Sequence, residues 1–204
     1  MNDRDFMRYS RQILLDDIAL DGQQNCSTAV LIIGLGGLGT PAALYLAGAG
    51  VGTLVLADDD DVHLSNLQRQ ILFTTEDIDR PKSQVSHQRL TQLNPDIQLT
   101  ALQQRLTGEA LKDAVARADV VLDCTDNMAT RQEINTACVA LNTPLITASA
   151  VGFGGQLMVL TPPRSRVLPL PVARYPGSRT QLPHGGRGWP GGRGYGHFAG
   201  TGSH

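Results

Sequence analysis

A glycine-rich turn, GLGGLG at residues 34–39, constrains the fold of this chain more than any other feature. It follows an apolar, β-branched run at residues 29–33 and precedes an Ala-rich segment, about residues 38–49, that predicts a helix. Another β-branched run, at residues 53–57, comes after two glycines that end this helix. Strand, turn, helix and strand in this order predict a βαβ unit with parallel strands and a right-handed crossover.

The same alternation of strands and helices continues to about residue 160. The further predicted segments are a helical entry at 4–24, a short helix or turn at 64–72, helices at 81–93, 109–118 and 127–141, and strands at 97–102, 120–124, 145–148 and 155–160. The helical entry has four apolar residues spaced to share one face: Phe6, Tyr9, Ile13 and Leu14. This pattern predicts an α/β fold with a Rossmann-like, doubly wound and mostly parallel sheet.

The composition is that of a globular protein and excludes several classes. Hydrophobic residues make up 41% of the 204 residues, charged residues make up 18%, and the formal net charge is −2. We therefore expect neither a disordered chain nor a general nucleic-acid binder. No apolar run reaches the ~18 residues that span a membrane. The N-terminus, MNDRDFMRYSRQ, carries charges where a signal peptide needs an apolar core, so a cytoplasmic protein is expected.

The three cysteines, Cys26, Cys124 and Cys138, are widely spaced and form no CxxC pair. Their spacing therefore predicts neither a zinc framework nor a disulfide scaffold. We expect Cys124 and Cys138 to be buried as small hydrophobic side chains.

The glycine-rich turn has the form of a phosphate-binding loop. Glycines permit a tight turn and let the backbone approach a phosphate, while the start of the next helix offers free N–H groups and a positive dipole end. Asp58 ends the next strand, 19 residues after Gly39, where such folds place the carboxylate that binds ribose hydroxyls. The pattern predicts an adenosine nucleotide; a packing turn without a ligand is the alternative.

Three polar residues beyond Asp58 indicate which nucleotide is bound. They are Asn66, Arg69 and Lys82. An arginine grips phosphate oxygens with a bidentate fork and a lysine adds a point charge, so this set favours a triphosphate over a dinucleotide. An NAD(P)-binding oxidoreductase on the same βαβ unit stays as an alternative, although no residue is an evident acid for hydride transfer.

Asp126 is expected at the carboxyl edge of the sheet, because it comes just after the strand at 120–124. Folds of this class bind their ligands at that edge. Beside bound phosphates the Asp126 carboxylate could hold Mg²⁺ through oxygen. Alternatively, it serves only as the cap of the helix that begins at residue 127.

From residue 164 to residue 204 the sequence is crowded with Pro, Gly and Arg and has neither helical nor strand period. Such a segment buries too little apolar surface to order itself. It is either an RNA-binding tail, since GGRGWPGGRGYG interleaves arginines with aromatic residues, or an out-of-frame ending. We favour the out-of-frame ending. The expected domains are therefore a nucleotide-binding domain at 1–163 and a frameshifted, disordered tail at 164–204.

Several stretches, taken in order, resemble one known family. They are RYSRQI (residues 8–13), GLGGLG (34–39), DDDDVHLSNLQRQ (58–70), RPK (80–82) and LDCTDN (122–127). The set is similar to the ThiF/MoeB/HesA family of E1-like sulfur-carrier adenylyltransferases. Residues 1–163 are most similar to its ThiF branch, which serves thiamine synthesis.

The resemblance implies ATP-dependent adenylation of the C-terminal Gly-Gly carboxylate of a ubiquitin-like sulfur carrier (ThiS-like) in thiamine thiazole biosynthesis. With ATP and Mg²⁺ as cofactors, it implies these roles: Asp58 for the ribose, Gly37 for the phosphate-side turn, Asn66, Arg69 and Lys82 for the phosphates, and Asp126 for Mg²⁺. In the family, the arginine that matches Arg11 reaches the nucleotide of the neighbouring subunit, which implies a homodimer. Catalysis would then need no nucleophilic side chain, only alignment and charge neutralisation by Arg11, Arg69, Lys82 and Asp126.

The chain departs from the family after residue 163. Family members carry two CxxC zinc pairs in their C-terminal part and this sequence has none, so the structural Zn²⁺ site is expected to be absent. The ThiF branch also has a cysteine that bonds to the carrier in this part, whereas no cysteine follows Cys138. We therefore expect a sheet truncated at its C-terminal part, with an exposed apolar edge. An inactive nucleotide-binding remnant is a further alternative.

Overall fold

The computed structural model of this chain describes residues 2–24 and 28–161. These residues belong to one compact unit, Met1–Leu170. The predictions for Cys26 and for the tail at 164–204 lie outside the described residues. The domain boundary at residue 163 stays a prediction.

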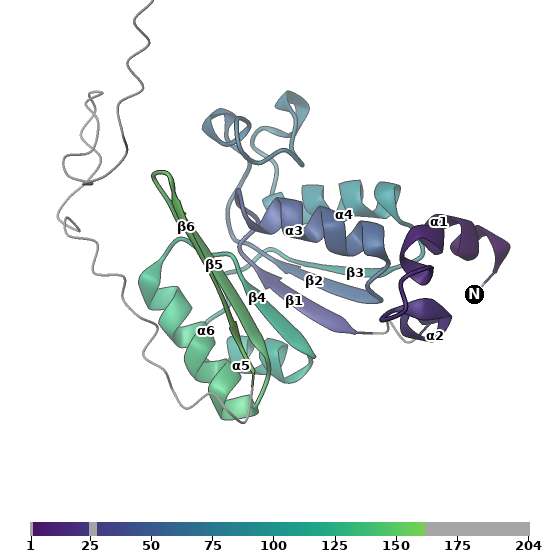
Figure 1. Ribbon diagram of the computed structural model, residues 1–204. Helices are drawn as coiled ribbons and strands as arrows, with labels where there is room; N and C mark the ends of the chain where they lie inside the picture. Colours follow the sequence, from purple (N-terminus) through teal and green to yellow (C-terminus); the bar gives the residue numbers. More distant parts are fainter. Residues whose placement is uncertain (1, 25–27, 162–204) are drawn as a thin grey trace, which may run out of the picture. The chain divides into compact units, whose positions relative to one another are not determined.

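Helices and strands alternate along the chain, as the periodicity predicts (Figure 1). The helices are α1 (Asp3–Ile13), α2 (Ala19–Gln24), α3 (Gly39–Ala49), α4 (Lys82–Leu93), α5 (Gly108–Ala116) and α6 (Met128–Leu141), with short 3₁₀ helices η1 (Leu64–Asn66) and η2 (Thr75–Asp77). The strands are β1 (Ala29–Ile33), β2 (Thr53–Ala57), β3 (Gln98–Leu102), β4 (Val120–Asp123), β5 (Leu145–Val151) and β6 (Gly154–Leu160). Among the described helices, none has the length and apolar character needed to cross a bilayer.

The strands form one sheet in the order β3-β2-β1-β4-β5-β6. Strands β1 to β5 pair in parallel, whereas β6 runs antiparallel to β5. This arrangement confirms the predicted doubly wound, mostly parallel sheet. It also places the reversal of strand order between β1 and β4, and folds of this kind bind ligands in the crevice at that point.

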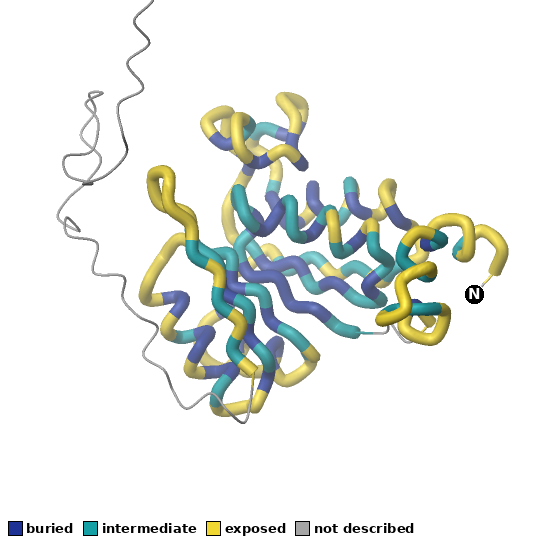
Figure 2. The backbone as a smooth tube through the Cα atoms, in the orientation of Figure 1, coloured by how far each residue is buried: buried dark blue, intermediate teal, exposed yellow. Residues whose placement is uncertain are grey.

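Helices cover both faces of the sheet, with α3 and α4 on one side and α5 and α6 on the other (Figure 1). Strand β1 contributes to the core on both sides. Val30 and Ile32 belong to the cluster under α3 and α4, while Leu31 and Ile33 belong to the cluster under α5 and α6. Most of β1 is accordingly coloured as buried in Figure 2. This burial on both faces explains why β1 is a continuous apolar run in the sequence.

The N-terminal segment differs from its prediction. Two helices, α1 and α2, replace the single helical entry expected at 4–24. Tyr9 is buried, and its hydroxyl accepts a hydrogen bond from Asn94 Nδ2 at 2.8 Å. Phe6 and Leu14 are 50% and 76% exposed, so the predicted apolar face is wrong for these two residues. Helix α1 contacts the ends of α3 and α4, where Gln12 donates to Ala49 O and Arg8 donates to Leu93 O, and Phe6 and Leu14 stay at the surface.

The antiparallel end of the sheet exposes apolar side chains. Strand β5 extends to Val151, beyond the predicted end at residue 148, because it pairs with β6 along its whole length. Phe153 in the hairpin turn and Leu157 and Val159 of β6 are exposed. These side chains form an exposed apolar surface at the edge strand of the described sheet.

Candidate nucleotide site

The glycine-rich turn joins β1 to α3 at the carboxyl edge of the sheet. At two of its glycines the backbone is packed too closely for a side chain. Gly34 has φ +90°, and a Cβ there would lie 3.0 Å from the backbone carbonyl of Cys124. A Cβ at Gly39 would lie 1.9 Å from the carbonyl oxygen of Gly34. Only glycine fits at these two positions, as expected where a backbone must approach a ligand closely.

The turn presents backbone N–H groups at the start of α3. Leu38 precedes the helix and provides no side-chain cap. Within residues 2–24 and 28–161, the N–H groups of Gly36, Gly37 and Leu38 have no hydrogen-bond acceptor. These free donors, together with the positive end of the α3 dipole, suit an anionic ligand.

Asp58 follows β2 and lies beside the turn. Its Oδ2 accepts a hydrogen bond from the Leu35 N–H at 2.6 Å, and its Oδ1 accepts one from the Asp60 N–H at 2.8 Å. Burial raises the pKa of the Asp58 carboxyl, although the two backbone hydrogen bonds and the charge of Lys82 oppose the rise. A partly desolvated carboxylate in this place is suited to accept hydrogen bonds from ligand hydroxyls.

Arg69 covers the turn at Gly37. A Cβ at Gly37 would lie 3.5 Å from Arg69 Cγ, so the aliphatic stem is in ordinary contact with the turn. The guanidinium is exposed and donates one hydrogen bond, to Ser65 O at 3.0 Å, which leaves further N–H groups for a ligand. The neighbouring Gln70 is buried, with Nε2 close to Gly36 and with Oε1 unpartnered among the described residues. Gln70 was not among the predicted site residues, because its approach to the turn depends on how the segment after β2 folds.

Lys82 is the first residue of α4 and only 4% of it is exposed. Its Nζ lies 2.9 Å from Asp60 Oδ2, so a buried cation is paired with an exposed carboxylate. Its backbone N–H also donates to Asp60 O at 3.0 Å. These contacts bring Lys82 close to Asp58, and its positive charge opposes the rise in the Asp58 pKa that burial causes.

Asn66 is buried in the segment between β2 and α4, but its side-chain oxygen is already used. Oδ1 accepts a hydrogen bond from the His63 N–H at 3.1 Å and caps η1. A phosphate accepts hydrogen bonds and does not donate them, so Asn66 could contact one only through its Nδ2 group.

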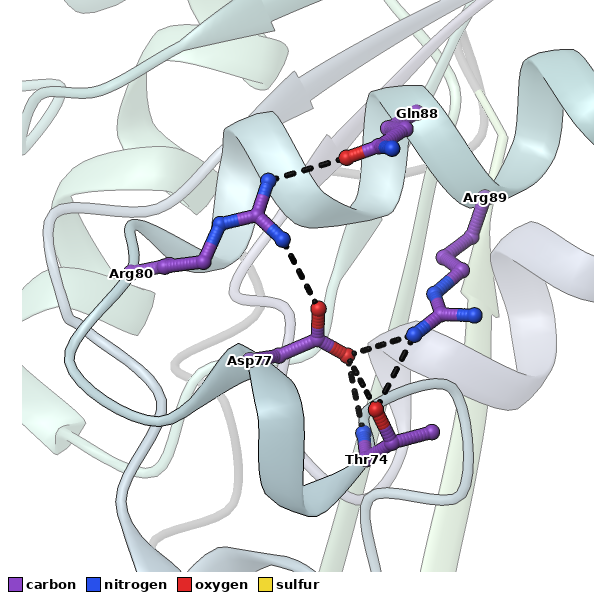
Figure 3. Close-up of polar contacts among 5 residues, drawn as sticks. All are labelled: Thr74, Asp77, Arg80, Gln88 and Arg89. Atoms are coloured by element: carbon purple, nitrogen blue, oxygen red, sulfur yellow. Dashed lines mark hydrogen bonds and ion pairs between the residues drawn. The ribbon is translucent and has the colours of Figure 1, made fainter.

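The segment between β2 and α4 is fixed by a buried carboxylate, Asp77 (Figure 3). Both the N–H and the hydroxyl of Thr74 donate to Asp77 at 2.9 Å. Arg80 and Arg89 form ion pairs with the same carboxylate at 3.0 and 2.9 Å. Arg80 also donates to Gln88 at 2.9 Å. Since Gln88 and Arg89 are on α4, this network joins η2 to the helix that begins with Lys82.

The Asp77→Asn variant is expected to lose about 1–3 kcal/mol of unfolding free energy at neutral pH, because a neutral amide replaces a charged acceptor of two arginines. Burial alone would raise the pKa of Asp77, but hydrogen bonds from Thr74 and Arg89 outweigh it, and the pKa lies below its ordinary value of 3.8. The carboxylate therefore stabilises the fold fully above about pH 4, and this contribution is lost as the pH falls through the lowered folded-state pKa.

Urea denaturation at neutral pH and at about pH 3 measures this effect. The stability gap between Asp77→Asn and the unchanged protein should narrow at the lower pH. Asp113→Asn, on the exposed face of α5, is the matched control and should change little. A gap of the same size at both pH values would contradict the expected ionisation of Asp77.

Asp126 lies in the loop between β4 and α6, on the other flank of the glycine-rich turn. This loop touches the turn, because a Cβ at Gly34 would meet the Cys124 carbonyl. The Asp126 side chain is exposed and forms no hydrogen bond or ion pair within the described part of the chain. The alternative role of Asp126 as a helix cap is wrong, since Asn127 caps α6 with its own side chain.

A buried polar network lies beneath this loop. Asp123, the last residue of β4, accepts hydrogen bonds from the Thr125 N–H and hydroxyl at 3.1 and 2.7 Å, and from the Thr147 hydroxyl at 2.7 Å. Arg131 of α6 donates to the carbonyl oxygens of Thr125 and Ala148, and to Thr147 Oγ1. Sequence reasoning missed this network, because Asp123 ends a run that was assigned as an apolar strand and Arg131 is in an ordinary helical segment.

Arg11 is not part of the site of its own chain. It is exposed in the last turn of α1. Helix α1 packs near the C-terminal end of α3, where Gln12 donates to Ala49 O at 2.8 Å. That end of α3 lies at the amino edge of the sheet, opposite the glycine-rich turn. The structure thus separates Arg11 from the other predicted site residues, which lie in the turn or in the segments that flank it: Gly37, Asp58, Asn66, Arg69, Lys82 and Asp126.

The two described cysteines are not arranged as nucleophiles. Cys138 is fully buried in the core and Cys124 is partly buried beside the glycine-rich turn. Burial, reinforced by the charge of Asp123, raises the pKa of both thiols to about 12. They therefore stay protonated at neutral pH, in agreement with the expected role of packing residues.

Comparison with known proteins gives a consistent set of relatives. The ThiF family model matches residues 9–182. The chain is 95% identical over 164 residues to the sulfur carrier protein ThiS adenylyltransferase of Escherichia coli (strain K12), a match that covers 80% of this chain. It is 44% identical over 162 residues to the molybdopterin-synthase adenylyltransferase of the same strain, a match that covers 79% of this chain. In both cases the chain spans 65% of the length of the relative.

Solved structures share the fold at lower identity. E. coli tRNA N6-threonylcarbamoyladenosine dehydratase, TcdA, in complex with ATP is 26% identical with a TM-score of 0.67, over 72% of this chain and 60% of that one. E. coli MccB with AMPCPP and MccA is 26% identical with a TM-score of 0.68, over 76% of this chain and 48% of that one. The first of these proteins was therefore solved with the nucleotide that the sequence predicts for this chain.

Proposed function

Because this chain belongs to the ThiF family, we propose that it uses ATP to adenylate the C-terminal Gly-Gly carboxylate of a ThiS-like sulfur carrier in thiamine thiazole biosynthesis. One observation carries the proposal: free backbone N–H groups and Arg69 meet at one turn, and the Asp58 carboxylate beside this turn lies next to the Asp60–Lys82 pair. The 95% identity to a ThiS adenylyltransferase over 164 residues supports the choice of carrier. The NAD(P) alternative has no comparable support.

The proposed reaction places two anions next to each other. A carboxylate oxygen of the carrier attacks the α-phosphorus of ATP, the bond from that phosphorus to the bridging oxygen breaks, and pyrophosphate leaves with the electron pair. The products are the acyl-adenylate of the carrier and pyrophosphate. Neither described cysteine is needed as a nucleophile, so the contribution of the protein is to align the reactants and to neutralise charge on phosphate oxygens.

Each side chain of the site has a task in this scheme. Asp58 accepts hydrogen bonds from the ribose hydroxyls, and Gly37 lets the backbone approach the phosphates. Arg69 and Lys82 supply positive charge to the phosphates, with Asn66 as an additional donor. Lys82 is held by the exposed Asp60 in the described structure, and a bound phosphate would compete with that carboxylate for the ammonium group.

The residues at this edge fit a magnesium ion by their chemistry. Mg²⁺ prefers oxygen ligands, and the exposed Asp126 carboxylate is unpartnered within the described residues. A carboxylate oxygen from each of Asp58, Asp59 and Asp60 also lies within 4.8 Å of the others, but Asp58 and Asp60 already have partners. We assign the ion to Asp126, where it would neutralise charge on the phosphate oxygens.

A homodimer is part of the proposal because of the position of Arg11. In its own chain this arginine lies at the sheet edge opposite the glycine-rich turn, so it can act on a nucleotide only in a second subunit. The exposed apolar residues of α1, Phe6 and Met7, agree with a surface that packs against another chain. The cytoplasmic location and the absence of a structural zinc site stay predictions.

Exchange of radiolabelled pyrophosphate into ATP tests the proposed reaction. The purified chain should catalyse exchange only when a ThiS-like carrier ending in Gly-Gly is present, because pyrophosphate leaves only as the acyl-adenylate forms. A carrier that lacks its two final glycines is the control and should give no exchange. Tight ATP binding without carrier-dependent exchange would reject the adenylation while leaving the nucleotide site intact.

A further inference from the structure

We propose that the buried network of Asp123, Thr147 and Arg131 positions the loop that carries Asp126, and so sets the strength of Mg²⁺-dependent nucleotide binding. This inference rests on the proposed function, in which Asp126 faces the phosphates through Mg²⁺. The three residues are positioning residues, because they lie beneath the loop and reach the ligand edge through the loop backbone, chiefly at Thr125.

Thr125, the residue before Asp126, is held from two directions. Its N–H and its hydroxyl donate to Asp123 Oδ1 at 3.1 and 2.7 Å. Its carbonyl oxygen accepts a hydrogen bond from Arg131 Nη2. All the polar groups of Thr125 are thus engaged, so the backbone has little freedom at this point.

The residue after Asp126 is fixed as well. Asn127 Oδ1 accepts hydrogen bonds from the N–H groups of Ala129 and Thr130 at 2.9 and 3.2 Å, which ties it to the first turn of α6. Asp126 therefore lies between two anchored neighbours, while its own side chain is exposed and unbonded within the described residues. This arrangement fixes the position of the Asp126 backbone and leaves its carboxylate available to a ligand.

The Thr147 hydroxyl is the bridge that completes the network. Asp123 and Arg131 form no direct ion pair within the described residues; Thr147 donates to Asp123 Oδ2 at 2.7 Å and accepts from Arg131 Nη1 at 3.4 Å. Asp123 is 1% exposed and Arg131 is 9% exposed, so water cannot readily replace a lost partner. Because these residues belong to β4, β5 and α6, the bridge locks three elements around the loop.

A network that served packing alone would affect stability and leave ligand binding unchanged. The proposed positioning role makes a different prediction, because it couples Thr147 to the Mg²⁺-dependent part of the ATP affinity through Asp126. Mutation of residues that support a metal ligand typically changes metal affinity 10- to 100-fold. The coupling can therefore be measured by binding, without reference to turnover.

The test is a double-mutant cycle on the full chain, with the Kd for ATP measured in Mg²⁺ and again in a chelator. In the unchanged protein Mg²⁺ should tighten ATP binding, and Asp126→Asn should remove most of this gain. Thr147→Val should reduce the factor by which Mg²⁺ tightens ATP binding by about tenfold, without changing the Kd for ATP in chelator. Combined with Asp126→Asn it should cause no further loss, because both changes remove the same contact.

Two further variants separate positioning from misfolding. Thr147→Ser keeps the hydroxyl and should keep the gain from Mg²⁺. Thr136→Val, a matched change on the exposed face of α6, should behave like the unchanged protein. The inference would be overturned if Thr147→Val lowered stability while Mg²⁺ still tightened ATP binding as in the unchanged protein. It would also be overturned if the double variant lost Mg²⁺-dependent ATP affinity by the product of the two single losses.

The remaining outcomes also decide the matter. If Asp126→Asn keeps the full gain from Mg²⁺, Asp126 does not hold the ion, and the inference falls while ATP binding stands. If the unchanged protein binds no ATP in either condition, the proposed function fails, and the inference fails with it.

Discussion

The Gly39→Ala variant is expected to lose about 3 kcal/mol of unfolding free energy, because overpacking against backbone is costly. The added Cβ would lie 1.9 Å from the carbonyl oxygen of Gly34. That oxygen is backbone and cannot move aside as the end of a flexible side chain could. Either the turn opens or α3 shifts, and both disturb the N–H groups of Gly36 and Gly37. The variant should therefore also lose most of its affinity for ATP.

Gly48→Ala is the matched control, since Gly48 is in the same helix and a Cβ there would meet nothing within 4 Å. This variant should be as stable as the unchanged protein or more stable, by up to about 1 kcal/mol, because alanine favours the helix over glycine. Urea denaturation and ATP titration of both variants provide the comparison. If Gly39→Ala matched Gly48→Ala in stability and ATP affinity, the described closure of the turn would be wrong.

The Lys82→Met variant is expected to bind ATP more weakly by about 1.5–3 kcal/mol, or roughly 10- to 150-fold in Kd, as loss of a charged hydrogen bond usually costs. Lys82 is buried and the only partner that the described structure gives its ammonium group is Asp60, whose side chain is 67% exposed. When Lys82 is replaced, Asp60 turns to water, and the similar length of methionine fills the space of the lysine stem. The fold should therefore survive while the phosphate contact is lost.

Lys112→Met is the control for the general effect of removing a lysine. Lys112 is on α5 and pairs with Glu109 at the surface, away from the glycine-rich turn. Its replacement should leave the ATP affinity unchanged because Lys112 is not among the residues of the turn, and it should cost little stability because exposed ion pairs contribute little. Equal ATP affinities of Lys82→Met and the unchanged protein would show that Lys82 does not contact the phosphates.

Local sequence signals predicted most of the fold. The bounds of β1 and β2 were predicted to the residue, because β-branched runs between glycines and a turn leave little choice of ends. The tight closure at Gly39 and the position of Asp58 also followed from spacing alone. The long hairpin of β5 and β6 was underestimated, since strand length there depends on pairing between two segments and not on either segment alone.

The predicted site residues were those that a local motif or a charge makes recognisable. Arg69, Lys82 and Asp126 are recognisable by charge and by their place after strands. Asp123 and Arg131 are not, because their role depends on Thr147, a partner from another strand that no local pattern connects to them. The exposure of Phe6 and Leu14 has the same origin, since helical spacing gives the face of a helix but not the width of the surface that it meets.

The most direct test of the account is a calorimetric titration of the full chain with ATP in the presence of Mg²⁺ and, separately, with NAD. The cationic phosphate-side residues should make ATP bind at least about tenfold more tightly than NAD, a difference of about 1.4 kcal/mol. NAD binding that equals or exceeds ATP binding would contradict the central claim that this turn holds a triphosphate.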